Sequence, residues 1–310
     1  MSVFAGRIRA AYHGRTESAI GMKRAPPKPM ESWKTVKDLR DRVAVVTGGA
    51  NGIGFGLATR FLQEGMRVVI ADNDVADLCR AAERLRELGE VLTVHTDVAD
   101  ASSVQALADA TIEHFGEVHV LCNNAGVGGM QRFATTSLAT WEWTLGVNLW
   151  GVINGCNIFL PLLAAQDKAY IVNTASMAGF MTTAPLHPYT ASKAAVVALS
   201  ESMAHEFKTE FPNVGVAVLC PAYTATSIRN DERNAPAGHV PREQADPELE
   251  ELRNQVNSDI DKGVSTEFVA DLVVAGMAAG KTHIFPSPDW LDYWQDRVDR
   301  VRKQIDPAMP

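Results

Sequence analysis

The sequence predicts an α/β fold, a doubly wound parallel sheet of Rossmann-like type in one domain. From Asp41 onward, short β-branched runs alternate with amphipathic segments of helical length. The runs are continuously apolar, which is typical of parallel strands that are covered by helices on both faces. A glycine-rich turn at 47–54 joins the first run to the first helix. We place this domain at about 37–288.

Seven strands and six helices are expected in alternation, and right-handed crossovers between parallel strands then give the doubly wound topology. The strand-like runs are 43–47, 67–71, 91–96, 118–122, 169–174, 214–220 and a short one at 282–285. The helices are expected at about 54–64, 75–88, 101–115, 138–166, 189–210 and 266–279.

Composition and charge exclude several classes of function. The net charge of −8 without a long basic run disfavours nucleic acid and anionic membrane surfaces as partners. No apolar stretch is expected to reach the roughly 18 residues that cross a bilayer. The eight histidines show no metal-ligand spacing, so we expect no metal. The four widely spaced cysteines are expected to be buried free thiols in a reducing compartment, which predicts a cytoplasmic protein.

Two segments lie outside the regular pattern near the chain's ends. Residues 1–36 are basic and carry a proline cluster at 26–29. Three interpretations stay open for this segment. It is a disordered extension, it precedes a true start at Met22 or Met30, or it is a transit-type segment, which is rich in arginine and poor in acids. Residues 289–310 are expected to form a C-terminal helix and tail. Its apolar side chains recur at helical spacing, which indicates packing within the chain or between subunits: Trp290, Trp294, Val298 and Val301.

The segment 229–262 is polar, contains three prolines and lacks a strand-like run. It follows the last core strand, on the side of the sheet where ligands bind in such folds. A long insertion at this place is a lid over the site or a passive surface loop.

The glycine-rich turn has the features of a phosphate-binding loop. Glycines allow a tight turn and a close backbone approach, and the helix that follows directs free N–H groups at phosphates. The spacing is Gly-x-x-x-Gly-x-Gly, which differs from the G-x-G-x-x-G fingerprint, and a glycine-rich turn can also have a purely steric origin. The expected cofactor-binding residues here are Gly48, Asn51, Gly52, Ile53 and Gly54.

Asp72 bears on the choice of cofactor. It ends the second strand, 18 residues after Gly54. An acid there can accept hydrogen bonds from the adenosine ribose and repels the 2′-phosphate of NADP. No Lys or Arg lies in 47–54 to attract that phosphate, so NAD is the expected cofactor. The alternative role of Asp72 is to cap the next helix, unless Asp74 holds that cap.

At this point the sequence resembles the short-chain dehydrogenase/reductase family, over roughly residues 40–285. The matching motifs occur in the family's order: TGGANGIG (47–54), Asp97-Val98, Asn123-Asn124-Ala125-Gly126, Asn148 in a V-N-L stretch, Ser176, and Tyr189-x-x-x-Lys193. The resemblance implies that Asp97 and Val98 meet the adenine ring and that Asn124 lies near the adenosine ribose. It also implies that Lys193 binds the nicotinamide ribose.

The sequence departs from the family pattern after the last core strand. Where the family has P-G-x-V-x-T, this chain reads Pro221-Ala-Tyr-Thr-Ala-Thr226. Thr224 therefore replaces a valine, and its backbone can still reach the nicotinamide amide. Thr226 can still contact the cofactor.

The catalytic residues implied are Asn148, Ser176, Tyr189 and Lys193. Oxidation of a secondary alcohol needs a base, and tyrosine has a pKa near 10, which a nearby cation lowers. Lys193 lies one helical turn from Tyr189 and can supply that charge. Ser176 can hold the substrate oxygen, and Asn148 resembles the residue that anchors a water connecting Lys193 to solvent.

The expected activity is NAD-dependent interconversion of a secondary alcohol and a ketone. The pocket is expected from 127–133, 176–187 and 222–262, whose Met and Phe side chains suggest a bulky apolar substrate, aryl or alicyclic: Met130, Phe133, Met177, Phe180 and Met181. The stretch 146–163 also resembles family members that act on aryl alcohols of lignin type. The alternatives are an NADPH-dependent carbonyl reductase and a cofactor-binding regulator or scaffold without turnover. By resemblance, the helices near 138–166 and 189–210 would form a homotetramer or homodimer.

Overall fold

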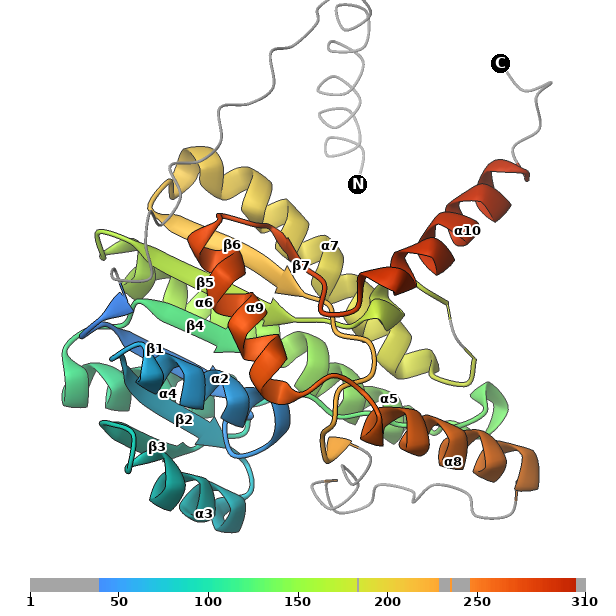
Figure 1. Cartoon of the computed structure of the whole chain (residues 1–310), viewed down its shortest axis with the longest axis horizontal. Helices are drawn as coiled ribbons and strands as arrows, with labels where there is room; N and C mark the ends of the chain where they lie inside the picture. Colours follow the sequence, from blue (N-terminus) through green and yellow to red (C-terminus); the bar gives the residue numbers. More distant parts are fainter. Residues whose placement is uncertain (1–38, 183, 229–234, 236–245, 305–310) are drawn as a thin grey trace, which may run out of the picture. The chain divides into compact units, whose positions relative to one another are not determined.

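The computed structural model describes residues 39–182, 184–228, 235 and 246–304. Seven parallel strands form one sheet in the order β3-β2-β1-β4-β5-β6-β7 (Figure 1). The strands are β1 Val43–Thr47, β2 Arg67–Asp72, β3 Val91–His95, β4 Val120–Asn123, β5 Ala169–Thr174, β6 Val214–Leu219 and β7 His283–Ile284. The predicted doubly wound parallel sheet is confirmed. The strand order reverses between β1 and β4, and ligands bind beyond the carboxyl ends of strands at such a point.

Helices cover both faces of the sheet, and each face has its own apolar core. One core joins the sheet to α2, α3 and α9 through side chains such as Phe61, Leu78 and Val273. The other joins it to α4, α6 and α7 through side chains such as Leu107 and Phe159. The bounds of these helices are α2 Gly52–Gln63, α3 Val75–Leu85, α4 Ala101–Phe115, α6 Gly151–Ala164, α7 His187–Glu210 and α9 Thr266–Ala278.

The remaining elements lie around the carboxyl edge of the sheet. They are η2 Phe133–Thr135, α5 Leu138–Leu145, the π-helical turn η3 Gly146–Trp150, η4 Met177–Gly179, α8 Pro247–Asp261, η6 Pro288–Trp290 and α10 Leu291–Arg302. α8 lies in the segment expected to be a lid or loop. Asp246 begins it by accepting a hydrogen bond from the Leu249 N–H, and Pro247 fits the first helical position. The rest of the expected lid, 229–245, lies outside the described residues except for 235.

The helical run Leu138–Ala164 corrects one expectation from the sequence. It joins α5, η3 and α6 into 27 residues that contain an 18-residue window with a mean hydropathy of 1.4, long and apolar enough to cross a membrane by length and composition. A core helix of a soluble protein passes the same test, so this run is weak support for a membrane span. One side of α6 is buried against the sheet through Val152, Phe159 and Leu163. The cytoplasmic location and the homo-oligomer stay predictions.

The cysteines and the C-terminal helix meet their expectations in part. All four cysteines are free, and three of them are buried, but Cys79 on α3 is exposed because its position on the helix faces away from the sheet. At the C-terminus, Trp290 and Trp294 pack on aromatic side chains of the domain, whereas Val301 is 56% exposed. The basic extension 1–36 lies outside the described residues.

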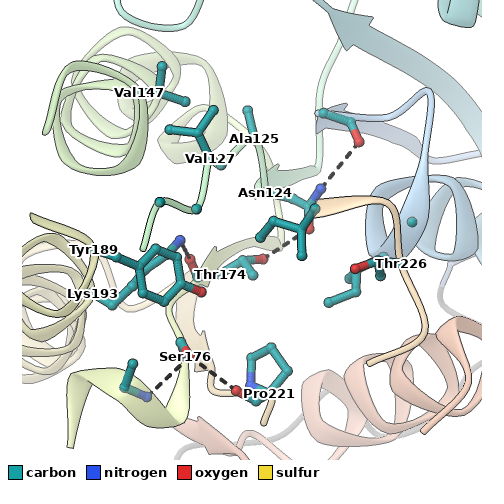
Figure 2. Close-up of a pocket in the computed structure, with 18 of the residues that line it drawn as sticks. Asn124, Ala125, Val127, Val147, Thr174, Ser176, Tyr189, Lys193, Pro221 and Thr226 are labelled. Carbon is teal, nitrogen blue, oxygen red and sulfur yellow. Dashed lines mark hydrogen bonds between the residues drawn. The ribbon is translucent and has the colours of Figure 1, made fainter. Parts of the chain in front are cut away.

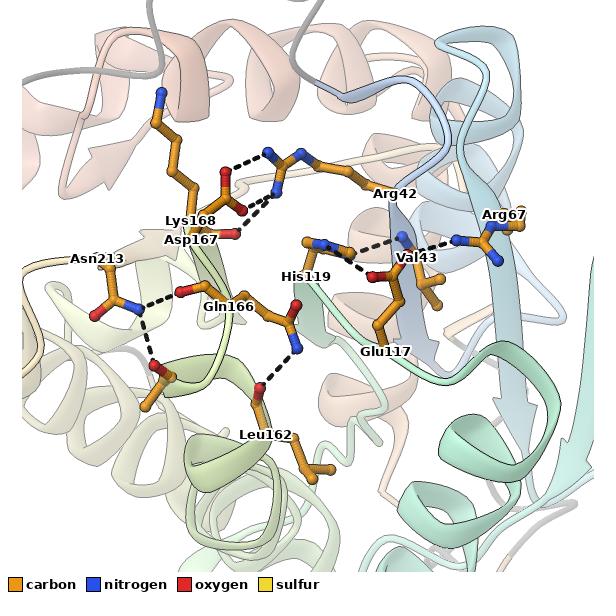
Figure 3. Close-up of polar contacts among 11 residues, drawn as sticks. Arg42, Val43, Arg67, Glu117, His119, Leu162, Gln166, Asp167, Lys168 and Asn213 are labelled. Carbon is orange, nitrogen blue, oxygen red and sulfur yellow. Dashed lines mark hydrogen bonds and ion pairs between the residues drawn. The ribbon is translucent and has the colours of Figure 1, made fainter.

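Polar contacts join the turns at the amino edge of the sheet (Figure 3). Arg42, just before β1, pairs with Asp167, just before β5, at 2.8 Å and 3.0 Å. His119, just before β4, is buried, and its Nδ1 accepts a hydrogen bond of 3.2 Å from the Val43 N–H. Glu117 lies 3.8 Å from the other ring nitrogen of His119. This edge is structural, because the ends of the strands that bind ligands lie opposite it.

Titration of His119 should make the fold sensitive to acid. Burial lowers the pKa of His119 in the folded chain below its ordinary value of 6.5. The contribution of His119 to stability is therefore complete above a pH of about 6.5. It is lost as the pH falls below that value, because the unfolded chain binds the proton more readily. We expect the free energy of unfolding, measured by chemical denaturation, to fall less between pH 7 and 5 in His119→Asn, which keeps an acceptor that does not titrate.

A second variant separates the hydrogen bond from the titration. His119→Leu leaves the buried Val43 N–H without its acceptor and should cost about 1–3 kcal/mol at pH 7.5. Equal slopes of stability against pH in the wild type and His119→Asn would show that His119 does not control the acid response.

Candidate active site

A cavity of about 1030 Å³ opens at the carboxyl edge of the sheet, where ligands bind in this architecture. Residues that end or follow β1 to β6 line it, together with residues of α5, α7 and α8. A cavity of this size lies at the upper end of the range for small-molecule and cofactor sites. The sequence therefore predicted the correct edge of the sheet.

The glycine-rich turn forms one wall of the cavity. Gly48 and Gly52 have φ angles of +61° and +52°, a region that side chains rarely adopt. A Cβ at Gly54 would lie 2.1 Å from the Gly48 carbonyl oxygen, so the absence of a side chain lets α2 pack closely on the turn. Gly54 itself does not line the cavity. Asn51 and Ile53 line the cavity. The first turn of α2 carries no acidic side chain, so its N–H groups suit an anion.

Thr47 and Asn124 tie this turn to the end of β4. The Thr47 hydroxyl accepts hydrogen bonds from the N–H groups of Asn124 and Ala125 at 2.9 Å and 3.1 Å. The Asn124 amide in turn donates to the carbonyls of Thr47 and Gly48. Asn124 lines the cavity as expected, but the structure gives its amide a local role in holding the two loops together.

Asp72 lies at the cavity wall, at the end of β2. Its carboxylate accepts N–H bonds from Ala50 and Asp74, both at 3.1 Å. Burial raises the pKa of Asp72, and these N–H groups partly oppose that shift. Asp74 caps α3 by accepting from the Asp77 N–H, so the capping role falls to Asp74. Asn51 joins the glycine-rich turn to the first turn of α3 by donating a hydrogen bond to Asp77 at 2.7 Å.

Four further predicted cofactor residues line the same cavity. Asp97 is exposed, with one carboxylate oxygen accepting from the Ala99 N–H, and Val98 beside it is buried. Thr226 faces the glycine turn, since a Cβ at Gly52 would meet its side chain at 3.1 Å. Thr224 is 5% exposed, and its hydroxyl has no hydrogen-bond partner among the described residues.

These observations test whether a dinucleotide fits. Glycines leave room where a pyrophosphate would lie, an acid stands at the end of β2, and a buried threonine hydroxyl is left to bond a ligand. Buried polar groups are normally hydrogen-bonded, so Thr224 suits a polar group of a bound cofactor. The residues present therefore fit a nicotinamide dinucleotide.

Tyr189 and Lys193 stand one turn apart on α7 and both line the cavity (Figure 2). The Lys193 Nζ lies 5.6 Å from the centre of the Tyr189 ring and donates a 2.9 Å hydrogen bond to the Thr174 carbonyl. Lys193 is only 3% exposed, and this burial lowers its pKa to about 8. The helix thus brings a buried cation beside the phenol, as the sequence predicted.

Ser176 lies at the end of β5, across the same cavity. Its hydroxyl accepts a hydrogen bond from the Ala178 N–H at 3.1 Å and donates to the Pro221 carbonyl at 3.3 Å. These contacts fix the hydroxyl at the start of η4, in the cavity that Tyr189 also lines (Figure 2). The hydroxyl proton can turn from the Pro221 carbonyl to a substrate oxygen, because a serine hydroxyl rotates about its C–O bond.

Asn148 is fully buried in the π-helical turn and does not line the cavity. Its amide exchanges two hydrogen bonds with the backbone of Val127, at 2.8 Å and 2.9 Å, and donates to the Ser192 hydroxyl. Its side chain therefore supports the cavity wall beside Lys193. The water that it was expected to anchor stays a prediction.

The methionines of the expected substrate pocket are in place, but the two phenylalanines are not. Met130, Met177 and Met181 line the cavity. Phe133 is 66% exposed on η2, and its ring packs edge-on against His187. Phe180 points away from the cavity, into an aromatic cluster with Phe285 and Trp294. Both expectations were wrong because neighbouring residues in a turn point in different directions.

Several cavity residues were not singled out from the sequence. Trp143 lies on α5, where an apolar sequence gave no separate signal for it. Trp290 was expected to pack against the chain or another subunit, yet both residues line the cavity. On α8, Arg253 and Ile260 face the cavity at helical spacing, which a helical pattern in the expected lid could have indicated. The Arg253 guanidinium donates to the Met130 carbonyl at 2.9 Å and thereby joins α8 to the loop after β4.

Comparison with known proteins agrees with this geometry. The sequence model of the short chain dehydrogenase family matches residues 42–237. A short-chain dehydrogenase/reductase from Burkholderia phymatum, solved in complex with NAD, superposes with a TM-score of 0.83. It shares 36% identity, and the match covers 88% of this chain and 98% of that one.

Two curated relatives are dehydrogenases. The C alpha-dehydrogenase of a Sphingobium species is 33% identical over 82% of this chain and 83% of its own length. The 1-deoxy-11-beta-hydroxypentalenate dehydrogenase of Streptomyces exfoliatus is 32% identical over 86% of this chain and 90% of its own length. Fold, ordered motifs and relatives agree, and the chain belongs to the short-chain dehydrogenase/reductase family of oxidoreductases.

Proposed function

We propose that this chain is an NAD-dependent dehydrogenase that interconverts a secondary alcohol and a ketone, with Tyr189 as the base. The observation that carries the proposal is the buried Lys193 ammonium beside the Tyr189 ring, in the same cavity as the glycine-rich turn. A cation in low-dielectric surroundings favours the ionised phenol, because it stabilises the negative charge. That is the condition for a tyrosine to accept a proton near neutral pH.

Each residue of the site has a defined task in oxidation. Tyr189 accepts the proton of the substrate hydroxyl, and the Ser176 hydroxyl, turned away from the Pro221 carbonyl, donates a hydrogen bond to the same oxygen. Lys193 is held by the Thr174 carbonyl, which fixes its charge beside the phenol. Asn148 supports the loop at Val127 that closes the wall behind Lys193. Bound NAD supplies the nicotinamide ring that accepts the hydride from the carbinol carbon.

The preference for NAD is proposed from Asp72. Its carboxylate faces the place where the adenosine ribose would lie, at the carboxyl end of β2. There it can bond ribose hydroxyls, and it repels a 2′-phosphate. The solved Burkholderia relative binds NAD, in support of this choice. The alternative is an NADPH-dependent carbonyl reductase, but residues 47–54 of this chain include no basic side chain to receive that phosphate.

The proposed substrate is bulky and apolar. Methionine side chains and the aromatic residues Trp143, Tyr223 and Trp290 line the same cavity as Ser176 and provide an adaptable apolar surface. The names of the two curated relatives, a C alpha-dehydrogenase and a hydroxypentalenate dehydrogenase, support a substrate of this kind.

We also propose that the chain forms a homo-oligomer through the apolar run Leu138–Ala164. Only 39% of its most apolar 18-residue window is buried within one chain. Leu138 is 78% exposed and Trp150 is 56% exposed on this run. A second copy that covers these side chains removes apolar surface from water.

Loss of the Tyr189 hydroxyl tests the proposed reaction. Tyr189→Phe should lower kcat for oxidation of a secondary alcohol by about 10²–10⁴-fold, because the base is removed. Binding of NADH, followed by its fluorescence, should remain. Tyr170→Phe is the matched control, since the Tyr170 hydroxyl bonds the Lys281 carbonyl outside the cavity. Wild-type turnover by Tyr189→Phe would overturn the assignment, and NAD binding without any wild-type turnover would favour the scaffold.

Neutralising Asp72 tests the choice of cofactor. Asp72→Asn keeps an acceptor for the Ala50 N–H but removes the charge, so kcat/KM with NAD should fall about tenfold and that with NADP should rise. Asp74→Asn is the control, because Asn also caps helices and Asp74 does not line the cavity. An unchanged ratio of the two kcat/KM values in Asp72→Asn would contradict the role of this carboxylate.

Light scattering tests the assembly. In detergent-free buffer the wild type should elute as a dimer or tetramer, and Trp150→Glu should shift the mass toward the monomer, since a charge at the interface core is costly. A wild-type monomer at all concentrations, or a protein soluble only in detergent, would contradict the homo-oligomer.

A further inference from the structure

Residues that follow the part matched by the family's sequence model also line the cavity. That model ends at residue 237, whereas Ile260 on α8 and Trp290 at the end of η6 both line the cavity. The wall of the cavity therefore comes partly from the C-terminal region of the chain. Trp290 is the largest of them and belongs to no motif described above.

Trp290 forms an aromatic wall with Tyr223. The two ring centres lie 5.3 Å apart and the rings are nearly perpendicular, at 89°. Tyr223 comes two residues after Pro221, whose carbonyl accepts the hydrogen bond of Ser176. The wall thus begins beside the group that holds the substrate oxygen. Both rings are half-buried and both line the cavity, so each offers free aromatic surface to a ligand.

The C-terminal helix holds this wall in place relative to Ser176. α10 begins directly after Trp290, and its Trp294 packs on Phe180 with ring centres 5.0 Å apart. Arg297, one turn further, donates a 2.7 Å hydrogen bond to the Phe180 carbonyl. Phe180 follows η4, the turn that Ser176 begins. Trp290 and Ser176 are therefore anchored on the same short segment, and the position of the wall is fixed by contacts outside the cavity.

We propose that Trp290 determines specificity by selecting an aromatic ring next to the carbinol carbon of the substrate. This inference rests on the proposed function and narrows its substrate from aryl or alicyclic to aryl. Aromatic rings attract each other in edge-to-face geometry beyond the burial of their area, by an amount that corresponds to about 2- to 12-fold in an equilibrium or rate constant. A saturated ring of the same size gains the burial alone. Met177 and Met181, also in the cavity wall, add sulfur contacts that again favour an aromatic ring.

The test compares two alcohols that differ in the aromaticity of one ring. Values of kcat/KM are measured with NAD for 1-phenylethanol and 1-cyclohexylethanol, in the wild type and in Trp290→Leu. The ratio of phenyl to cyclohexyl should fall by about 2- to 12-fold in the variant, while comparison between enzymes cancels the intrinsic reactivity of the two alcohols. Trp290→Phe, which keeps a ring, should restore most of the ratio.

Trp294→Leu is the matched control. It makes the same change four residues further along the chain, at a side chain of α10 that packs on Phe180 and does not line the cavity. This variant should lower both rates through the support of the Ser176 turn, and it should lower the ratio less than Trp290→Leu does, because the Trp290 ring is kept. Thermal melting of all three variants identifies loss of folding.

Two results would overturn the inference. One is an unchanged ratio in folded Trp290→Leu, and the other is an equal fall of the ratio in Trp294→Leu, which would indicate general packing. If the wild type oxidises neither alcohol, the proposed function fails separately. Calorimetric titration with acetophenone and cyclohexyl methyl ketone in the presence of NADH then decides ring selection, since only the wild type should prefer the aromatic ketone.

Discussion

Burial of the Lys193 ammonium is the constraint on which the site depends. A buried cation is costly unless its hydrogen bonds are satisfied, and burial lowers its pKa to about 8. The Thr174 carbonyl provides one bond, and it does so because β5 ends there, directly under α7. A Cβ at Gly126 would lie 3.5 Å from the Lys193 Nζ and 3.3 Å from the Asn148 amide oxygen. The loop after β4 thus passes close to both groups.

The two edges of the sheet divide stability and function. At the amino edge, Arg42 and His119 join the turns before β1, β4 and β5 by hydrogen bonds to other residues of the chain. At the carboxyl edge, the Thr224 hydroxyl and the N–H groups at the start of α2 are available to a ligand. A parallel sheet produces this division, because all its strands end at one edge and the loops there converge.

The sequence predicted what local patterns determine. Each core strand is a continuous β-branched run, and Tyr189 and Lys193 share a helix face by spacing alone, so both followed from neighbours in the chain. Contacts between distant segments were not predictable in this way. Phe180 and Met181 are adjacent, yet only Met181 faces the cavity, because Phe180 packs on residues more than 100 positions away. Asn148 was identified by its motif, but its bonds to Val127 and Ser192 depend on the π-helical turn.

The division between motif and wall explains how one fold can keep a reaction and change a substrate. The groups proposed to handle the proton lie on or beside β5 and α7, whereas the wall proposed to contact the substrate includes residues of α8 and Trp290. A change at the wall alters which ring fits without moving the Lys193–Thr174 contact. The link through Arg297 and Phe180 sets a limit to that freedom, because the same segment carries Ser176. Substitutions that shift α10 are therefore expected to move Ser176 as well, whereas a change at the Trp290 ring acts on the wall.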